Sequence, residues 1–384
     1  MLAGVRSDVW DVVVIGSGPA GLAAAITAAG AGARTVVLER STHPRYKTCG
    51  GGLIAPSITT AARWIEVPAR DKVDTASFTL RGGREFTRRL DTPLLSMVVR
   101  EEFDNALRKA AQDAGAVIRE QALVRSVDQD PDRATARLVT GETVAAKVIV
   151  GADGSGGVSA RHVGATFDQV DVGLEVELPA SRSRARDWQG RLLIDWGPLP
   201  GSYGWVFPKG DRLTVGVIGD RTDGTKLKAY LADFRTNLGL DGLDPLHDSG
   251  HLTRCRTEDS PLARGRVLLA GDAAGLLEPW TREGISFALR SGRSAGFLAA
   301  RHRHAIPRLA DAYAEALGEE LLPEMAAGRR LLAAFRRHPR PFHTAMASGP
   351  GWRAFGAMCR GELTFAHAMR RRTLRTGMTL LARL

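Results

Sequence analysis

A glycine cluster and one distant acid near the start of the chain have the spacing of a nucleotide-binding site. Gly16, Gly18 and Gly21 form a G-x-G-x-x-G pattern directly after the β-branched run 12–15. Glycines at such a strand-to-helix turn let the backbone approach a pyrophosphate, whose charge the helix N-terminus stabilises. Glu39 ends the next apolar run, where a carboxylate can bind both hydroxyls of an adenosine ribose. The pattern predicts a dinucleotide site, and the glutamate favours a cofactor without a 2′-phosphate.

The apolar run from Val12 to Ala33 has a second interpretation, as a membrane or signal segment. Its five glycines and polar flanks argue against a membrane span, and no basic n-region or cleavage site precedes it. The strand, turn, helix and distal acid together favour the nucleotide site.

Two further strand-like runs end in an acidic glycine turn. The run 148–150 leads into G-A-D-G, which contains Asp153, and the run 267–269 leads into G-D-A-A, which contains Asp272. Either turn alone could be a strand end with a capping aspartate. After a dinucleotide pattern, an aspartate at a helix start can bind a ribityl hydroxyl while nearby amides meet the pyrophosphate. The three motifs in this order predict a flavin site.

The composition suits a globular enzyme, because 44% of the 384 residues are hydrophobic and 25% are charged. The three cysteines, Cys49, Cys255 and Cys359, have neither a zinc-binding nor a disulfide spacing, which predicts a reducing cytoplasm. The histidines also lack metal-ligand spacing, so we expect no metal.

Positive charge is concentrated at the C-terminal end. The net charge is +11, and residues 301–384 hold fifteen arginines, no lysine and six acids. Such a region could bind a nucleic acid, an anionic membrane surface or an acidic partner, or form a solvated helical surface. Because no nucleic-acid-binding module is recognisable, we expect no nucleic-acid partner. Peripheral membrane contact through this region stays open.

The elements that must position these motifs follow from hydrophobic periodicity and from Gly and Pro. They are strand–helix–strand over 8–40, a loop over 42–57, strands over 78–90 and 94–99, a helix over 101–115, strands over 116–150, β-rich segments over 166–252 with one helix over 225–238, a strand over 266–270, a long helix from Gly284, and helices interrupted at Pro323, 339–341 and 349–351. One domain is therefore expected to be built from segments far apart in the sequence.

The motif order G-x-G-x-x-G, G-A-D-G, G-D-A-A resembles the flavoproteins of the p-hydroxybenzoate hydroxylase fold, which bind FAD. Finer motifs resemble the geranylgeranyl reductase family. Residues 44–52 are similar to its P-x-x-K-x-C-G-G segment, 203–208 to its Y-x-W-x-F-P motif, and 100–104 to its R-x-x-F-D stretch. The resemblance covers roughly residues 8–300.

The resemblance implies an α/β fold: a Rossmann-like FAD-binding domain with a β-rich substrate-binding layer and a helical C-terminal region. The expected domains are a discontinuous FAD-binding domain over 1–75, 92–165 and 255–300, a β-rich substrate-binding domain over 76–91 and 166–254, and a basic helical region over 301–384.

The cofactor implied is FAD, with NAD(P)H or another reductant as the electron donor. The residues expected to bind FAD are Gly16, Gly18, Pro19, Ala20, Gly21, Glu39, Arg40, Cys49, Gly50, Gly51, Arg100, Val124, Asp153, Gly271, Asp272, Gly284 and Ile285.

Family members reduce isolated prenyl C=C bonds, which implies hydride transfer from flavin N5 and protonation of the neighbouring carbon. The expected catalytic residues are Cys49, Tyr203 and Trp205, and the expected substrate pocket is Tyr203, Trp205, Phe207 and Pro279. Cys49 could donate the proton or organise a water, or could be a small buried hydrophobe. The alternating aromatic residues could form a flat wall for a prenyl chain, or plain core. Lys47 and Arg45 could bind a phosphate or be solvated loop charges.

Two places depart from the family pattern. In the second motif, Gly156 and Gly157 stand where a serine is common after G-A-D-G. Arg282 stands where the family's P-x-x-G-E-G-I motif has glycine, which would let the backbone lie against the flavin ring. Arg282 could turn outward, or could place positive charge near the flavin or an anionic substrate.

The sequence therefore predicts an FAD-dependent reductase of a hydrophobic alkene, such as a prenyl lipid, in the cytoplasm with or without membrane association. A flavin monooxygenase acting on a secondary metabolite would use the same FAD motifs and is the alternative. A halogenase is less favoured, because its lysine-bearing G-x-G-E context is missing. An interpretation from a different functional class is a non-catalytic lipid or prenyl carrier that keeps FAD as a structural element.

Overall fold

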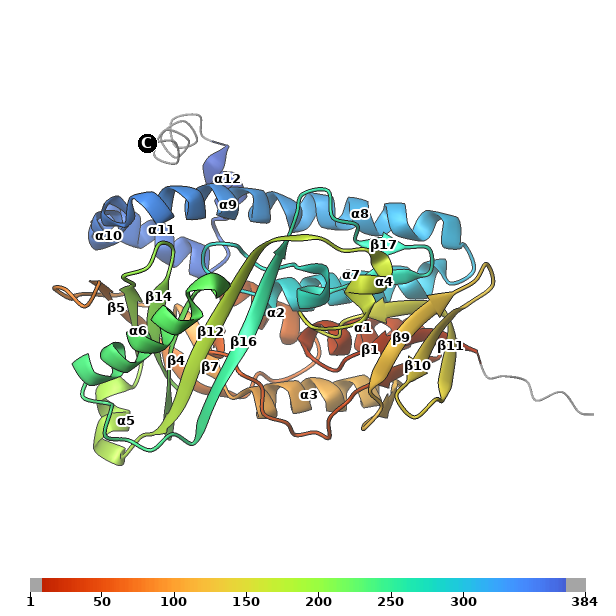
Figure 1. Ribbon diagram of the computed structural model, residues 1–384, viewed down its shortest axis with the longest axis horizontal. Coiled ribbons are helices and arrows are strands. Elements are labelled where there is room, and N and C mark those ends of the chain that lie inside the picture. The colour runs from red at the N-terminus through yellow and green to blue at the C-terminus, as the bar shows by residue number, and fades with distance from the viewer. Residues whose placement is uncertain (1–8, 371–384) are drawn as a thin grey trace, which may run out of the picture.

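The computed structural model describes residues 9–370, whose strands form three sheets (Figure 1). The first has the order β17-β18-β11-β1-β2-β8, with β10 paired to β11 and β9 to β10. Its strands are β1 (Trp10–Ile15), β2 (Thr35–Leu38), β8 (Val117–Arg119), β9 (Val124–Gln129), β10 (Ala134–Leu138), β11 (Thr143–Gly151), β17 (Ala263–Arg264) and β18 (Val267–Leu269). Because β1 pairs in parallel with both β2 and β11, the glycine-rich turn and the G-A-D-G turn leave the sheet at the same edge.

Helices cover this sheet because its central strands are apolar on both faces. The helices of this part are α1 (Pro19–Gly30), α3 (Arg100–Asp113), α4 (Ser159–Val163) and α7 (Ile285–His302), with the short 3-10 helix η2 (Gly271–Ala274). Helices α1 and α7 pack through glycine. A Cβ on Gly292 would lie 2.1 Å from Ala20 O, and one on Gly296 would lie 2.2 Å from Ala24 O. This close packing joins the first and third motifs, which are some 250 residues apart in the chain.

The second sheet has the order β16-β12-β15-β14-β13-β5-β6 and stands beside the first (Figure 1). Its strands are β5 (Thr75–Leu80), β6 (Phe86–Arg89), β12 (Phe167–Pro179), β13 (Arg191–Trp196), β14 (Tyr203–Pro208), β15 (Arg212–Asp220) and β16 (His247–Arg256). One face packs on α6 (Gly224–Asn237), with Val176 and Val206 of the sheet in one cluster with Tyr230 and Phe234 of the helix. The opposite face carries Tyr203, Trp205 and Phe207, since successive strand residues point to opposite sides. The division into domains stays a prediction.

The expected loop over 42–57 was wrong at its end, because β3 (Gly52–Leu53) and α2 (Ala55–Ala61) begin inside it. With β4 (Ala69–Val73) and β7 (Leu95–Val98), β3 forms a small third sheet. The helix was missed because its A-P-S-I-T-T-A sequence has three β-branched residues and weak helix propensity. Packing against α7 stabilises it instead.

The C-terminal region confirms the predicted helical pattern. It comprises η3 (Ile306–Arg308), α8 (Leu309–Glu320), α9 (Leu322–Arg337), α10 (Pro339–Ala347), α11 (Gly349–Cys359) and α12 (Phe365–Met369); α5 (Arg182–Trp188) and η1 (Arg221–Asp223) complete the elements. The breaks expected at Pro323, 339–341 and 349–351 coincide with helix starts. The last fourteen residues of the predicted basic region lie outside the described residues.

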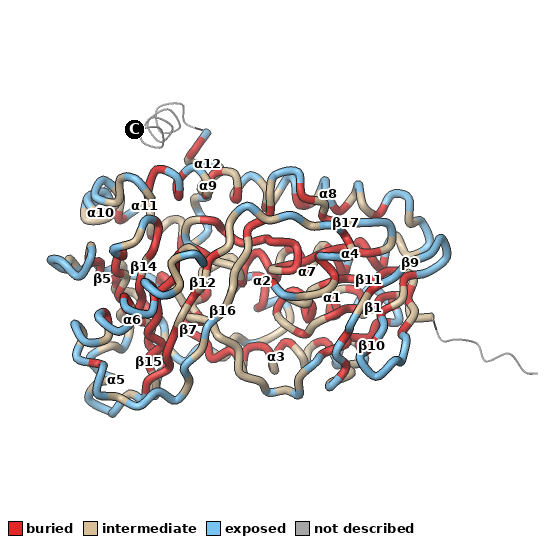
Figure 2. Tube along the Cα trace, in the orientation of Figure 1, coloured by how far each residue is buried: buried red, intermediate tan, exposed pale blue. Residues whose placement is uncertain are grey.

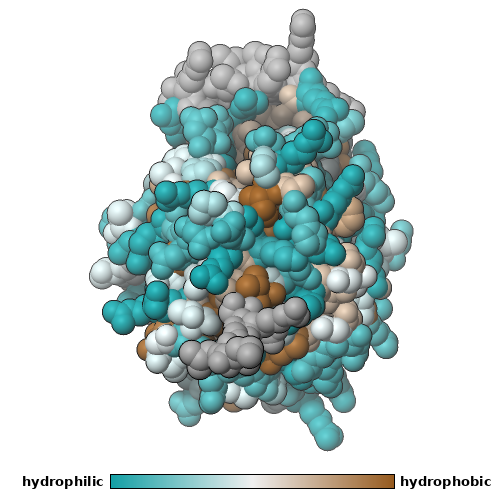
Figure 3. Space-filling model, turned by 90° about the vertical axis from the view of Figure 1, so that its right-hand side faces the viewer, coloured by the Kyte–Doolittle hydropathy of each residue, from teal (hydrophilic) through white to brown (hydrophobic). Residues whose placement is uncertain are grey.

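Burial is concentrated where the sheets and α1 and α7 meet, and the outer helices expose one side (Figure 2). The face formed by the right-hand end of Figure 1 is mainly hydrophilic, with small separate apolar patches (Figure 3). Among residues 9–370, no helix combines the length and apolarity that a membrane crossing requires.

Candidate active site

The glycine-rich turn has the geometry that a pyrophosphate requires. Gly16 has a φ of +95°, and a Cβ there would lie 2.4 Å from Ala152 O. A Cβ on Gly21 would lie 1.9 Å from Gly16 O, so these two glycines hold the turn against the G-A-D-G segment and the helix. Gly18 is different, because a Cβ there would meet nothing closer than Arg45 Nη2 at 4.0 Å. The backbone beside the N-terminus of α1, where Pro19 and Ala20 follow, is therefore open to an anion.

Glu39 is buried next to this turn and is charged. Its Oε2 accepts hydrogen bonds from Ser17 N (2.8 Å) and Ser17 Oγ (2.5 Å), and its Oε1 accepts one from Ser41 N (2.9 Å). Burial alone would raise the pKa of Glu39, but the bonds from Ser17 and the positive charge of Arg45 hold it below its usual value. A charged acceptor at this position suits ribose hydroxyls.

Two residues predicted to bind FAD beside Glu39 have different surroundings. Arg40 is exposed. Val124 is buried at the start of β9, next to a segment whose Ala122 N–H donates to Glu39 O (2.7 Å). Their roles in binding FAD stay predictions.

The third motif lies against the first motif and near Lys47 of the loop that precedes β3. A Cβ on Gly271 would lie 2.9 Å from the Cβ of Ala20. Asp272 Oδ2 is 3.5 Å from His251 Nε2. Burial would raise the pKa of Asp272, but His251 and the charges of Lys47 and Arg100 lower it below the usual value. Gly284 and Ile285 begin α7 beside this turn, since a Cβ on Gly284 would be 3.7 Å from Asp272 Oδ1.

Arg100 and Asp153 are both held by bonds within their own segments. Arg100 forms two hydrogen bonds of 2.9 Å with Asp104, and Arg45 Nη2 lies 3.5 Å from the same carboxylate. Asp153 accepts hydrogen bonds from Ser159 N (3.0 Å) and Ser159 Oγ (3.1 Å), and burial raises its pKa. Its backbone contacts Gly16, while its side chain bonds to the first residue of α4.

The predicted aromatic wall is formed by Tyr203, Trp205 and Phe207. It faces the cysteine loop, which comprises residues 46–51. Ring centroids are 6.0 Å apart between Tyr203 and Trp205 and 6.2 Å apart between Trp205 and Phe207. A Cβ on Gly50 would lie 2.9 Å from the ring of Phe207 and 3.5 Å from Trp205 Nε1. That indole nitrogen is buried and has no hydrogen-bond partner within residues 9–370. An unpartnered donor beside a glycine loop suits an incoming polar group.

Cys49 and Gly51 are held by Glu175 of β12, by Lys209, which follows β14, and by the third sheet. Cys49 is partly exposed, its N–H donates to Glu175 Oε1 (2.7 Å), and its carbonyl accepts a bond from Lys209 Nζ (3.0 Å). Gly51 has a φ of +77°, and a Cβ there would lie 2.3 Å from Val98 O. The cysteine loop is thus fixed between the aromatic wall and the small third sheet.

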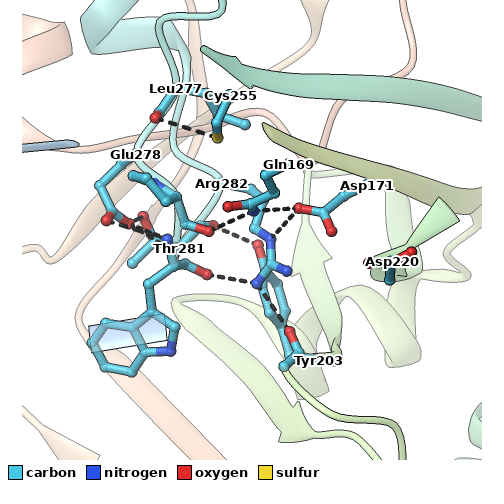
Figure 4. A network of polar contacts seen from close by, with 12 residues as sticks. Gln169, Asp171, Tyr203, Asp220, Cys255, Leu277, Glu278, Thr281 and Arg282 are labelled. Atoms are coloured by element: carbon cyan, nitrogen blue, oxygen red, sulfur yellow. Dashed lines mark hydrogen bonds and ion pairs between the residues drawn. The ribbon is translucent and has the colours of Figure 1, made fainter. Parts of the chain in front are cut away.

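The expectation that Arg282 could turn outward was wrong, because its side chain turns inward towards Asp171 (Figure 4). Its side chain is 2% exposed, and its Nε lies 3.0 Å from Asp171 Oδ2, a carboxylate that is 1% exposed. Its Nη1 donates to Gly201 O (3.0 Å) and Trp280 O (2.8 Å). The backbone of Arg282 has a φ of +58°, a conformation that favours glycine. The residue keeps a glycine-like backbone, and its charge is neutralised by Asp171.

Further bonds hold the loop around Arg282 (Figure 4). Glu278 accepts from the N–H groups of Trp280 and Thr281, Tyr203 Oη donates to Thr281 O (2.5 Å), and Gln169 Nε2 donates to Pro279 O (3.0 Å). Pro279 therefore lies in the same network as Tyr203. Its contact with a substrate stays a prediction.

Several residues of this site were not found from the sequence. Ser17 and His43 contact each other beside Glu39, with Ser17 Oγ 2.6 Å from His43 Nε2. Glu175 and Lys209 hold the cysteine loop. The one signal in the sequence for Glu175 was the L-E-V-E-L pattern of 174–178, which places carboxylates on one face of an apolar strand.

A separate cavity of about 240 Å³ between α2 and α7 was also missed. Its charged lining residues are Arg63, Arg290, Arg293, Glu320 and Arg360.

The residues present fit FAD, because an open glycine turn, a charged Glu39 and the Asp272 turn lie along one continuous region. A family model described as FAD binding domain matches residues 9–182. The chain is 31% identical over 318 residues to menaquinone reductase of Mycobacterium tuberculosis, covering 76% of each chain. It is 30% identical over 299 residues to geranylgeranyl diphosphate reductase of Rhodobacter capsulatus, covering 74% of each.

Solved structures share the fold. A geranylgeranyl bacteriochlorophyll reductase-like protein of Thermoplasma acidophilum superposes with a TM-score of 0.77 at 22% identity, over 94% of this chain and 98% of that one. A flavin-dependent brominase superposes with a TM-score of 0.73 at 19% identity, over 96% and 98%. The predicted α/β flavoprotein fold is confirmed. With its motifs and its relatives, the chain belongs to the geranylgeranyl reductase family of FAD-dependent oxidoreductases.

Proposed function

We propose that this protein saturates C=C bonds of a prenyl chain or a related hydrophobic alkene. The observation that carries the proposal is the aromatic wall of Tyr203, Trp205 and Phe207 facing the Cys49–Gly51 loop. Flat apolar side chains can hold an extended alkene in one orientation, which is what a reaction without an activating carbonyl needs. The relatives, named as reductases of a menaquinone and of a geranylgeranyl diphosphate, support this substrate class.

FAD, when bound and reduced, supplies the hydride for such a reduction. The chain's own residues have three tasks. The Gly16–Gly21 turn and Glu39 hold the adenosine and pyrophosphate end, and the Asp272 turn holds the ribityl end. The aromatic wall orients the alkene and excludes water. The loop network around Arg282 fixes the position of Tyr203, whose hydroxyl is bonded to Thr281 O.

Three finer points belong to the same proposal. The electron donor is NAD(P)H or another reductant. The substrate is a hydrophobic small molecule or a lipid. Contact with a membrane surface would use the arginine-rich C-terminal region.

The test uses the FAD-loaded protein, reduced with dithionite under anaerobic conditions. Geranylgeranyl diphosphate, menaquinone or a geranylgeranyl-chain phospholipid is added, and flavin reoxidation is followed by absorbance. Each saturated counterpart serves as the control ligand. With the diphosphate and the phospholipid, we expect reoxidation by the unsaturated probe only. With menaquinone, whose quinone ring can itself oxidise reduced flavin, the readout is the saturation of the prenyl chain in the product. Oxygen insertion in air without anaerobic turnover would instead make the protein a monooxygenase.

A variant pair tests the aromatic wall. Trp205→Ala removes the central ring of the wall and is expected to slow reoxidation about 10–100-fold, because misplaced reactants lose orientation. Trp188→Ala, on α5 and packed under Arg191 instead, is the matched control and should keep the wild-type rate. Equal effects of both variants would contradict the role of the wall.

A further inference from the structure

The face of β12 that points away from α6 carries three buried carboxylates, at positions 171, 175 and 177. Within residues 9–370, two of the three form an ion pair. Asp171, Glu175 and Glu177 are 1%, 2% and 3% exposed. Asp171 pairs with Arg282. Glu177 lies 3.0 Å from Lys209 Nζ and 3.2 Å from Arg212 Nη1. Glu175, between them, makes no ion pair within residues 9–370. A buried carboxyl that forms no ion pair retains its proton more readily than a paired one.

Glu175 is also in register with the aromatic wall. It pairs with Gly216 of β15, and Gly216 pairs with Trp205 of β14. Gly216 has no side chain, and the indole ring of Trp205 occupies the place that one would fill, since a Cβ on Gly216 would lie 2.2 Å from this ring. The ring therefore leans over the glycine towards β12 and Glu175. Glu175 and Trp205 therefore lie on the same face of the sheet, on either side of Gly216.

A chain of hydroxyl groups joins Glu175 to the edge of the sheet. Tyr46 Oη donates to Glu175 Oε1 (3.4 Å) and lies 2.9 Å from Ser249 Oγ, which also accepts from Thr48 Oγ1 (3.0 Å). Ser249 belongs to the edge strand β16 and pairs directly with Glu175. The ring of Tyr46 stacks on partly exposed His247 at 4.1 Å. Protons from solvent can therefore reach Glu175 through Ser249 and Tyr46.

The groups around Glu175 come from four segments. Tyr46, Lys47 and Cys49 belong to the cysteine loop, Glu177 to the same strand, and Lys209 follows β14; on β16, His247 pairs with Glu177 and stacks on Tyr46. Burial raises the pKa of Glu175, and Glu177 raises it further, while Lys209, Lys47 and the Cys49 N–H oppose the rise. The direction is consistent with the protonated acid expected from the geometry.

We propose that Glu175, rather than Cys49, donates the proton that completes alkene reduction in this protein. The inference rests on the proposed function. One alkene carbon receives a hydride, whose two electrons come from the reduced FAD, which is oxidised by losing them. The neighbouring carbon receives the Glu175 proton, and the alkene π pair forms that C–H bond. Glu175 is left as a carboxylate, which solvent reprotonates through Ser249 and Tyr46.

The test compares Glu175→Gln with Cys49→Ser in anaerobic single turnovers of the dithionite-reduced, FAD-loaded enzyme with geranylgeranyl diphosphate. Glutamine still accepts the Cys49 N–H but holds no acidic proton. We expect Glu175→Gln to lower the reoxidation rate by about 100-fold or more, and Cys49→Ser to keep it within about 10-fold. The wild-type rate should fall as rising pH removes the Glu175 proton, and Glu175→Gln should not show this dependence. FAD affinity and reduction by dithionite should not change.

Tyr46→Phe is the second variant and keeps the stack on His247. It should slow the turnovers that follow the first by about 10-fold relative to the wild type, because reprotonation is interrupted. A near wild-type first-turnover rate in Glu175→Gln would overturn the inference alone, whereas absence of any wild-type reoxidation by prenyl probes would overturn the proposed function as well.

Discussion

Replacing Arg282 by glycine changes two opposing terms that the structure separates. The backbone φ of +58° favours glycine, so Arg282→Gly should recover about 1 kcal/mol of strain. The side chain, however, is the cationic partner of Asp171, which is 1% exposed. Removing one partner of a buried pair costs about 3–5 kcal/mol. We therefore expect Arg282→Gly to be destabilised by about 2–4 kcal/mol, even though it restores the family residue.

The assay is urea unfolding of the FAD-saturated protein, followed by tryptophan fluorescence, with a double-mutant cycle. Asp171→Asn in the Arg282→Gly background removes the uncompensated charge, so the double variant should be more stable than the sum of the single effects by about 2 kcal/mol. Arg81→Gly is the matched control, because exposed Arg81 has a φ of +55° and no buried pair. It should lose no stability. The reasoning would be refuted if Arg282→Gly were as stable as the wild type.

Three further changes have defined outcomes. Gly292→Ala places a Cβ 2.1 Å from Ala20 O and should cost about 1–3 kcal/mol in thermal unfolding, whereas Gly318→Ala, with nothing within 4 Å, should gain up to about 1 kcal/mol; equal shifts would disprove the α1–α7 packing argument. Glu39→Gln should weaken FAD binding about 10–100-fold in a flavin fluorescence titration, and an unchanged affinity would argue against ribose binding there. Burial raises the pKa of Glu283 from 4.5 to about 7, so the folded state retains a proton that the unfolded chain releases, and stability should fall as pH rises between these values. Glu283→Gln should unfold with a flatter pH profile over that window, and an identical profile would contradict the assignment.

Local patterns predicted those parts of the fold that local physics determines. The turn at Gly16 and Gly21 is a steric requirement that leaves glycine at a fixed spacing. The breaks before α9, α10 and α11 coincide with proline or glycine at the helix start. Both kinds of signal are contained within a few residues of sequence. They sufficed for the FAD motifs and for the order of the elements.

Contacts between distant segments explain what was missed. Helix α2 has weak propensity and depends on α7, more than 200 residues away. The inward turn of Arg282 depends on Asp171 and Gly201, which β12 and the loop before β14 bring to it. The position of Glu175 beside Trp205 depends on strand register across β15. No spacing within one segment encodes these pairings.

The mass balance of one anaerobic turnover tests most directly whether this protein reduces a C=C bond with reduced FAD. Reduced, FAD-loaded protein is mixed with less than one equivalent of geranylgeranyl diphosphate, and the oxidised flavin and the product mass are measured together. We expect each equivalent of oxidised FAD to correspond to one reduced C=C bond, with a gain of two hydrogens and no oxygen in the product. An unchanged prenyl chain with the flavin still reduced, repeated with menaquinone and a geranylgeranyl-chain phospholipid, would contradict it.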